Sequence, residues 1–309
     1  MVVLNTFLGE LKIGLVDVGA SGGLEPRWRS IQKNIKAFLF EPDERSHQEL
    51  QLQSADHVGE IFQIGLGSSA SNALLNLCRS LGASSTLPPH LSFLSRFPNV
   101  ERFDVTRQET IKLSTLDECL INNWKDCDFI KLDTQGTELS ILRGAEALLD
   151  SPIIGLEIEV EFIRLYEGQD LFGDVSAHLE SKGFEFFDFV NICRWERGKF
   201  TLFGQAVFGD GLFLRSPEVF ATFLNSLPIE TARSKALKYI AIISLYDHLD
   251  LLPICITLFK QFLSAADVKA TKDLHASLLR RRRLSSFLLR AANFLLKPLG
   301  IRATGLQIS

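Results

Sequence analysis

The chain has 309 residues, of which 46% are hydrophobic and 23% are charged, a composition typical of globular proteins with a substantial core. The net charge of −4 provides no overall attraction for nucleic acid, and no apolar run reaches the roughly 18–20 residues that cross a membrane. The five cysteines form no Cys-X-X-Cys pair and show no spacing to histidine that is typical of metal ligands, so we expect reduced thiols in a cytoplasmic protein.

Strand patterns alternate with helical patterns over the first two-thirds of the chain. Short apolar runs bounded by glycine, proline or charged residues predict strands over 13–19, 35–42, 60–67, 128–133 and 152–160. A helix over 171–182 precedes two further predicted strands, at 184–190 and 204–215. Strands separated by helices favour a parallel, doubly wound sheet, and the short distance in sequence between the last two strands favours an antiparallel edge.

The pattern changes near Pro217. The remaining residues show helical periodicity and no convincing strand. We therefore predict two domains: an α/β domain over 1–216 and an all-helical extension over 217–309.

A glycine-rich turn follows the first predicted strand. It reads DVGASGG and contains Gly19, Ala20, Ser21 and Gly23. Glycines let the backbone turn sharply and approach a ligand closely, and the ligand crevice of open α/β sheets lies at this end of the strands. The GxGxxG spacing of dinucleotide sites is absent. The carboxylate of Asp17 would repel a pyrophosphate, but it suits a cation such as the ammonium group of S-adenosylmethionine.

Glu41 ends the second predicted strand, 22 residues after Gly19. An acidic residue at this point can accept hydrogen bonds from both ribose hydroxyls of a nucleoside. Together with the turn, it predicts S-adenosylmethionine as the cofactor. The third predicted strand lacks a terminal acidic residue, so the backbone near Gly65 and Leu66 is expected to meet the adenine.

Charged side chains gather where the fourth and fifth predicted strands end. Alternation along a strand puts Lys131 and Asp133 on one side of the sheet, and Glu157 and Glu159 on one side of the next strand. Buried carboxylates are costly unless they are paired or hydrogen-bonded. The gathering therefore predicts a functional site, although a Lys–carboxylate pair without any chemistry is the simpler alternative.

In the order and spacing of its motifs, the chain resembles the FkbM-type S-adenosylmethionine-dependent methyltransferases over residues 11–216. The resemblance rests on DVGASGG, FEPD, STLDE, FIKLDTQGTELSILRGA, IEVEFIRLYEGQDLF and GF. It implies the class I methyltransferase fold: a Rossmann-like, seven-stranded mixed sheet with helices on both faces and the last strand inserted antiparallel. It also implies S-adenosylmethionine as the cofactor, and a hydroxyl group, often on a sugar of a glycan or glycolipid, as the methyl acceptor.

For O-methyl transfer we predict Asp133 as the polar anchor or general base beside the methyl group, and Glu159 as the second candidate. Lys131 would orient these carboxylates and set their charge balance. Asp133 and Glu159 could instead hold Mg²⁺, which would bind the acceptor oxygen and acidify it. His90, on a loop that could cover the site, is a further candidate base.

Two other functions remain open from the sequence. A catalytically silent cofactor-binding domain that serves as an interaction module would keep the glycine-rich turn and Glu41, but it would not need Asp133. A nicotinamide-dependent oxidoreductase is disfavoured by the spacing of the turn and by Asp17. The binding of S-adenosylmethionine, of its demethylated product and of NAD separates these functions.

The last part of the chain is strongly basic. Nine basic and two acidic residues lie between Ala266 and Arg302, and leucines from Leu274 to Leu296 recur at helical spacing on one face. A basic amphipathic helix over 274–297 can lie on an anionic membrane surface. The alternative is that the leucines pack inside the protein or against a partner subunit.

Overall fold

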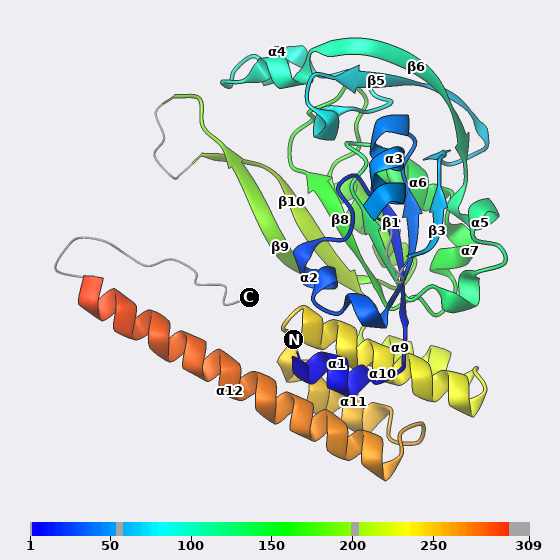
Figure 1. The fold of residues 1–309 in the computed structure, drawn as a ribbon, viewed down its shortest axis with the longest axis vertical. Coiled ribbons are helices and arrows are strands. Elements are labelled where there is room, and N and C mark those ends of the chain that lie inside the picture. Colours follow the sequence, from blue (N-terminus) through cyan, green and yellow to red (C-terminus); the bar gives the residue numbers. More distant parts are fainter. Residues whose placement is uncertain (1, 54–57, 199–203, 297–309) are drawn as a thin grey trace. The chain divides into compact units, whose positions relative to one another are not determined.

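A seven-stranded mixed sheet forms the centre of one of the two units into which the chain divides (Figure 1). The computed structural model describes residues 2–53, 58–198 and 204–296. Residues Glu10–Ser226 make up the sheet unit, whereas Met1–Gly9 and Leu227–Ser309 make up a helical unit.

The strands of the large sheet follow the order β3-β2-β1-β7-β8-β10-β9. β1, β2, β3, β7 and β8 are parallel to their neighbours in that group, whereas β10 pairs antiparallel with both β8 and β9. The expected class I fold, with its last strand inserted antiparallel, is thereby confirmed. The bounds are β1 Ile13–Val18, β2 Ile35–Phe40, β3 Val58–Phe62, β7 Phe129–Leu132, β8 Gly155–Glu161, β9 Glu185–Trp195 and β10 Gln205–Leu214.

The central strands carry near-continuous apolar runs because they are buried on both faces of the sheet. Every residue of β1, β7 and β8 is buried, as is usual for parallel strands that are covered by helices. Leu15, Ile130 and Leu156 have no exposed surface at all. The charged residues within these strands are therefore exceptions that need a specific explanation.

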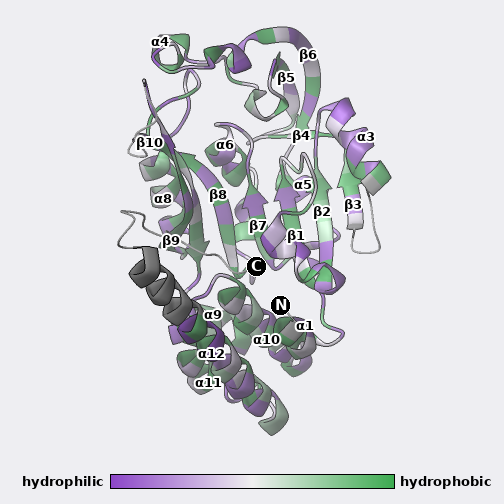
Figure 2. Ribbon diagram, turned by 60° about the vertical axis from the view of Figure 1, so that its left-hand side comes forward, coloured by the Kyte–Doolittle hydropathy of each residue, from purple (hydrophilic) through white to green (hydrophobic). Residues whose placement is uncertain are grey.

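Short helices connect and flank the strands. α6 and α8 pack against β8, while α3, which is largely hydrophilic, packs beside β3 (Figure 2). The helices of the sheet unit are α2 Pro26–Arg29, α3 Glu44–Gln53, α4 Leu91–Leu94, α5 Leu116–Cys119, α6 Glu138–Arg143, α7 Glu146–Leu149, α8 Phe172–Ser181 and α9 Pro217–Asn225.

A second, three-stranded sheet has no counterpart in the sequence prediction. It consists of β4 (Gly65–Leu66), β6 (Val105–Ser114) and β5 (Ser71–Cys78), with β6 in the middle. The strand predicted over 60–67 is therefore two strands that belong to different sheets, β3 and β4. β6 is mostly exposed and carries charged residues along its length, so it lacks the apolar alternation by which strands are recognised.

Arg215 ties α9 to the sheet unit. Its guanidinium carbon lies 4.1 Å from the ring centre of Phe184 and 4.3 Å from that of Phe223, which belongs to α9. The guanidinium also donates hydrogen bonds to the carbonyl oxygens of Leu149, Ile153 and Lys182. The sheet unit therefore runs to Ser226, beyond the boundary predicted at 216.

The helical unit contains α1 (Val2–Leu8), α10 (Ile229–Leu245), α11 (Leu252–Leu258) and α12 (Ala265–Leu296). The start of α12 is fixed by Asp267, whose carboxylate accepts hydrogen bonds from Arg233 and from the backbone of Ser264. No helix in the described ranges is long and apolar enough to cross a membrane. Arg280–Arg283 are exposed on α12, whereas the side chains of the predicted amphipathic helix beyond residue 284 lie outside the described residues.

Candidate active site

Polar residues from neighbouring strands meet at one edge of the large sheet. Gly19, Glu41 and Asp133 directly follow the parallel strands β1, β2 and β7. The register of these strands places them level with one another and with Glu159, near the end of β8. β10 runs the other way and sets Asp210 opposite both Glu159 and Asn191. In spatial order, this level of the sheet contains Glu41, Gly19, Asp133, Glu159, Asp210 and Asn191.

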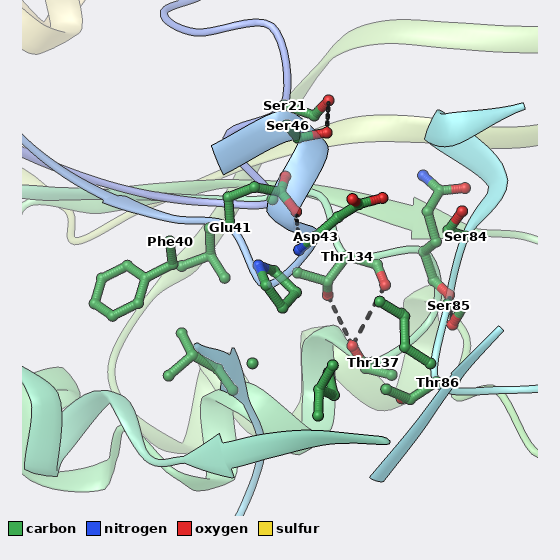
Figure 3. Close-up of a pocket in the computed structure, with 18 of the residues that line it drawn as sticks. Ser21, Phe40, Glu41, Asp43, Ser46, Ser84, Ser85, Thr86, Thr134 and Thr137 are labelled. Carbon is green, nitrogen blue, oxygen red and sulfur yellow. Dashed lines mark hydrogen bonds between the residues drawn. The ribbon is translucent and has the colours of Figure 1, made fainter. Parts of the chain in front are cut away.

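A cavity of about 260 Å³ opens at this edge. Ser21 and Ser46 lie on one side of it, and Ser84, Ser85 and Thr86 lie on another (Figure 3). The second sheet covers the cavity with apolar side chains from β5 and β6. Of the predicted cofactor-binding residues, its wall includes Gly19, Ser21, Glu41, Gly65, Leu66 and Asp133.

The glycine-rich turn is held tightly against the ends of two strands. The backbone N–H groups of Gly19 and Ala20 both donate to the carbonyl of Phe40, at 3.1 and 3.2 Å. Gly19 has a φ of 79°, a conformation that residues with a side chain rarely adopt. A Cβ atom at this position would also lie 1.9 Å from the carbonyl oxygen of Asp133. Only glycine fits here. Ala20 and Gly23 belong to the same turn, but they do not line the cavity.

Glu41 presents a buried carboxylate at the cavity wall. Its Oε1 accepts a hydrogen bond of 2.9 Å from the backbone N–H of Asp43 (Figure 3). Burial raises the pKa of Glu41 to about 7, although the Asp43 N–H acts in the opposite direction. A ligand that donates hydrogen bonds would stabilise the ionised carboxylate, and the two ribose hydroxyls of a nucleoside can do so.

Lys131 lies among three carboxylates. Its Nζ is 3.2 Å from Glu25 Oε1, 3.8 Å from Asp133 Oδ2 and 3.9 Å from Asp17 Oδ1. Burial acts to lower the pKa of Lys131, but the charges of Asp17, Asp133 and Glu25 outweigh it and raise that pKa. Burial also raises the pKa of Asp17 to about 6, with Lys131 opposing it. Asp17 therefore has a cationic partner within the protein, and it lies behind the cavity wall.

Gln135 links the two predicted catalytic carboxylates. Its Nε2 donates to Asp133 Oδ1 at 2.9 Å and to Glu159 Oε1 at 2.6 Å. Burial raises the pKa of Glu159 well above its ordinary value, and the negative charges of Asp133 and Glu161 raise it further. The structure thus brings Asp133, Glu159 and Lys131 into one cluster, as the spacing along the strands predicts.

Asp210 is a member of this cluster that the sequence analysis misses. Burial, followed by the charge of Asp133, raises the pKa of Asp210 to about 6, while a hydrogen bond with Asn191 lowers it. Its only signal in the sequence is an aspartate between two glycines, Gly209 and Gly211, in an otherwise apolar strand. Because β10 is inserted out of sequence order, that signal could not be assigned to the site.

His90 does not line the cavity. Its Nδ1 lies 3.1 Å from the carbonyl oxygen of Arg164, and its Nε2 lies 2.7 Å from the hydroxyl of Ser92. The backbone N–H of His90 donates to the carbonyl of Leu165. These contacts join two loops, and the structure does not bring this imidazole to Asp133.

The cavity matches the chemistry of S-adenosylmethionine in two respects. Glu41 suits the ribose hydroxyls, and the apolar side chains of Ile64, Leu66 and Ile141 offer a surface for the adenine ring. Within the part of the chain that the structure describes, no group of three or more His, Cys, Asp or Glu side chains is arranged to hold a metal ion.

Comparison with known proteins gives one family match: the methyltransferase FkbM domain, over residues 17–186. Among solved structures, a SAM-dependent methyltransferase from Aquifex aeolicus is 14% identical with a TM-score of 0.31, over 69% of this chain and 87% of that chain. Sp1610 of Streptococcus pneumoniae, to which a tRNA (m1A22) methyltransferase activity has been ascribed, is 13% identical with a TM-score of 0.32, over 88% of this chain and 96% of that chain. No curated protein matches.

Proposed function

Because this chain belongs to the FkbM methyltransferase family and uses S-adenosylmethionine, we propose that it is an O-methyltransferase whose acceptor is a hydroxyl group of a sugar in a glycan or glycolipid. The observation that carries this proposal is the pair of carboxylates, Asp133 and Glu159, joined through Gln135 at the edge of the cavity. A neutral hydroxyl needs a base, and this pair offers one.

Different residues around the cavity bind different parts of the cofactor. We assign Glu41 to the ribose hydroxyls, the turn at Gly19 and Ser21 to the amino-acid end of the cofactor, and the backbone near Gly65 and Leu66 to the adenine. When bound, S-adenosylmethionine supplies an electrophilic methyl group. The protein has to align the acceptor oxygen with that methyl group, and alignment accounts for much of the acceleration in such displacements.

The acceptor hydroxyl loses its proton as its oxygen bonds to the methyl carbon, while the bond between that carbon and the sulfonium sulfur breaks and a neutral thioether leaves. We assign Asp133 to accept this proton because its side chain is partly exposed at the cavity wall, whereas Glu159 is buried and its raised pKa favours the protonated form. Lys131, 3.8 Å from Asp133, balances the charge of the ionised carboxylate. A positioned base of this kind contributes roughly 10²–10⁴-fold to the rate.

The electrostatics of the site favour a glycan or small-molecule acceptor over a nucleic acid. Asp133, Glu159 and Asp210 bring several acidic groups together beside a single lysine, Lys131. Nucleic acids are bound chiefly by basic residues that neutralise phosphates. An acidic cluster beside the cavity is therefore poorly suited to a phosphate backbone, but carboxylates readily accept hydrogen bonds from sugar hydroxyls.

We also propose that the enzyme works in the cytoplasm and touches the inner membrane surface through the 274–297 helix. Arg280–Arg283 are exposed on the described part of α12, and Arg282 is paired with Asp247 at 3.4 Å. Clustered basic residues are attracted to anionic lipid headgroups. Such contact would bring the enzyme to lipid-linked acceptors.

Two measurements test the function. In calorimetry, we expect S-adenosylmethionine and its demethylated product to bind and NAD not to bind, whereas binding of NAD would favour an oxidoreductase. Mass spectrometry of glycans and lipids from a deletion strain should then reveal a species that has lost one methyl group. Cofactor binding without such a loss would favour the silent interaction module.

A further inference from the structure

Gln135 adopts a backbone conformation that is unusual for its residue type. In the described ranges, the non-glycine residues with a positive φ are Asn99, Gln135 and Asp247, and the φ of Gln135 is 57°. Asn and Asp enter this region comparatively easily, whereas longer side chains are rarer there. Such strain persists only where surrounding contacts impose it, and it concentrates at functional sites.

Contacts from three separate segments impose this conformation. The hydroxyl of Ser85 donates to the backbone carbonyl of Gln135 at 2.8 Å. The side-chain oxygen of Gln135 lies 3.1 Å from the hydroxyl of Tyr166, which is completely buried. The side-chain nitrogen donates to Asp133 and Glu159. Every polar atom of the amide thus has a defined partner.

The orientation of the amide follows from these partners. The other neighbour of the Tyr166 hydroxyl is the carbonyl oxygen of Ala83, at 3.0 Å. The Tyr166 hydroxyl has only one hydrogen to share between this carbonyl and Gln135, so the two carboxylates decide the orientation. Ionised carboxylate oxygens can only accept, and the amide atom that lies 2.9 Å from Asp133 Oδ1 and 2.6 Å from Glu159 Oε1 is therefore the nitrogen, which leaves the amide oxygen facing Tyr166. The two hydrogens of the NH₂ group are then left for the two carboxylates, one each.

We propose that Gln135 is a positioning residue for methyl transfer, and that its amide holds Asp133 at the cavity wall and Glu159 behind it in a fixed relation. This inference rests on the proposed function. The amide donates a hydrogen bond to each carboxylate, and at Glu159 such a donor opposes the burial and the negative charges that raise the pKa of that group. Tyr166 acts one step further away because its hydroxyl contacts the oxygen of this amide.

The surroundings of Glu159 explain why donors are needed there. Asp133 of the loop after β7, Glu161 of β8, Glu138 of α6 and Asp210 of β10 all act on Glu159 with negative charge. The ammonium group of Lys131, which belongs to the same cluster, is directed to Asp17, Glu25 and Asp133. The Gln135 amide is therefore the donor that the structure provides between the two catalytic candidates.

The test compares four full-length proteins: the parent, Gln135→Glu, Tyr166→Phe and the control Gln261→Glu. Gln135→Glu keeps the shape and the oxygen that faces Tyr166, but it replaces the NH₂ donors with an acceptor. Gln261 is exposed on the helical unit and provides the same change of charge outside the sheet unit. Thermal unfolding and calorimetry with S-adenosylmethionine check that each protein folds and binds.

Methyl transfer is measured from labelled S-adenosylmethionine to a glycan and lipid extract of the deletion strain, across a range of pH. We expect Gln135→Glu to lower the rate near pH 7 by about 10- to 100-fold, the equivalent of a lost hydrogen bond to a charged group. The acidic limb of its rate profile should move to higher pH, because its carboxylates hold their protons more firmly. Tyr166→Phe should shift the profile in the same direction by a smaller amount, and Gln261→Glu should match the parent.

The inference is overturned if Gln135→Glu keeps the parent's pH profile, even at a lower rate, because a merely structural role would slow transfer equally at every pH. If Gln135→Glu does not fold, Tyr166→Phe decides the matter by the same criterion. A parent that binds no S-adenosylmethionine or methylates nothing in the extract overturns the proposed function and this inference with it. A parent that is active beside variants with unshifted profiles overturns only the role of Gln135.

Discussion

Gly19 and Asp133 are in contact through their backbones, so closely that a Cβ atom on Gly19 would lie 1.9 Å from the carbonyl oxygen of Asp133. The turn assigned to the cofactor and the strand end that carries the candidate base therefore cannot move independently. A side chain at residue 19 would displace both.

We expect Gly19→Ala to lower the free energy of unfolding by about 2–3 kcal/mol, because it adds a steric clash to the strain of a positive φ. Gly22 is a matched control, since its φ is 84° and nothing lies within 4 Å of its added Cβ. Gly22→Ala should therefore cost only about 1–2 kcal/mol. Urea unfolding measures both losses. Equal losses would show that the contact with Asp133 adds nothing.

Substitution of Glu41 tests the ribose assignment. Glu41→Ala should weaken the binding of S-adenosylmethionine by about 1–3 kcal/mol, because the ribose hydroxyls would lose their acceptor. Glu44→Ala, on the exposed first turn of α3, is the control and should bind like the parent. Calorimetry measures both affinities. Undiminished binding by Glu41→Ala would remove this residue from the ribose site.

The same carboxylate should make cofactor binding depend on pH. Its pKa is raised to about 7, so it is largely protonated near pH 6 and largely ionised near pH 8. Hydrogen bonds from the ribose favour the ionised form. The affinity of the parent for S-adenosylmethionine should therefore rise from pH 6 to pH 8, and binding should release protons. Glu41→Ala should lack the pH dependence that the ionisation of Glu41 causes.

For Asp133, the decisive quantity is turnover. Asp133→Asn should retain the fold and lower turnover at least about 10²-fold, because the amide cannot accept the proton. Asp104→Asn, at an exposed surface ion pair with Arg79, should leave turnover unchanged. Turnover should also survive EDTA, and loss of activity in the chelator would support the Mg²⁺ alternative.

The apolar runs of the sequence predict the large sheet well because burial on both faces leaves a strong signal. They cannot reveal β6, which is mostly exposed and places apolar side chains over the cavity only near its end, at Ile111 and Leu113. The same limit applies to the strand predicted over 60–67, which continues in sequence from β3 into β4 although the two strands belong to different sheets. Local pattern shows that a strand exists, but it does not show which sheet the strand joins.

The site divides in a similar way. Asp133 and Glu159 could be paired from sequence because β7 and β8 are adjacent parallel strands and alternation fixes their faces. Asp210 could not be assigned to the site from sequence, because its strand, β10, is inserted between β8 and β9. The role of Gln135 depends on a left-handed backbone and on Tyr166, which approaches from a distant loop. Neither the left-handed backbone nor the contact with Tyr166 can be recognised from the sequence around Gln135.

The buried carboxylates should make the protein less stable as the pH rises. Asp210 has a pKa of about 6 in the folded state against an ordinary value of 3.8, so the folded chain binds more protons than the unfolded chain between these values. Stability from this group is fully present below about pH 4 and is lost as the pH rises through about 6. Asp210→Asn should thus stabilise the protein at about pH 7.5, by on the order of 1 kcal/mol after allowance for solvent screening, and change little near pH 4.

Thermal unfolding at both pH values measures this difference. Asp188→Asn, exposed on the neighbouring strand β9, provides the control and should show no such dependence on pH. A stabilisation of Asp210→Asn that is equal at the two pH values would mean that the ionised carboxylate is not the cause.

Binding to lipid vesicles tests the basic helix. Reversing Arg280, Arg281 and Arg283 to glutamate should abolish sedimentation with anionic vesicles at low salt, since each basic residue near such a surface contributes about 1 kcal/mol. The control reverses three exposed cations of the sheet unit, Arg79, Arg107 and Lys112, and should still sediment. High salt should release the parent. If the parent stays in the supernatant at low salt, the leucines of this helix pack inside the protein and do not bind lipid.

The contacts of Arg215 determine which parts of the sheet unit unfold together. The guanidinium contacts backbone carbonyls and aromatic rings from stretches that are distant in sequence. If one of these stretches detached, the buried cation would lose a partner, which is costly. These stretches should therefore exchange their amide hydrogens as a single cooperative unit, without independent fraying. That unit extends from α7 to α9 and includes β8 and β10, the two strands that carry Glu159 and Asp210, so the position of these two carboxylates depends on contacts of a residue that does not line the cavity. The partners are Leu149, Ile153, Lys182, Phe184 and Phe223.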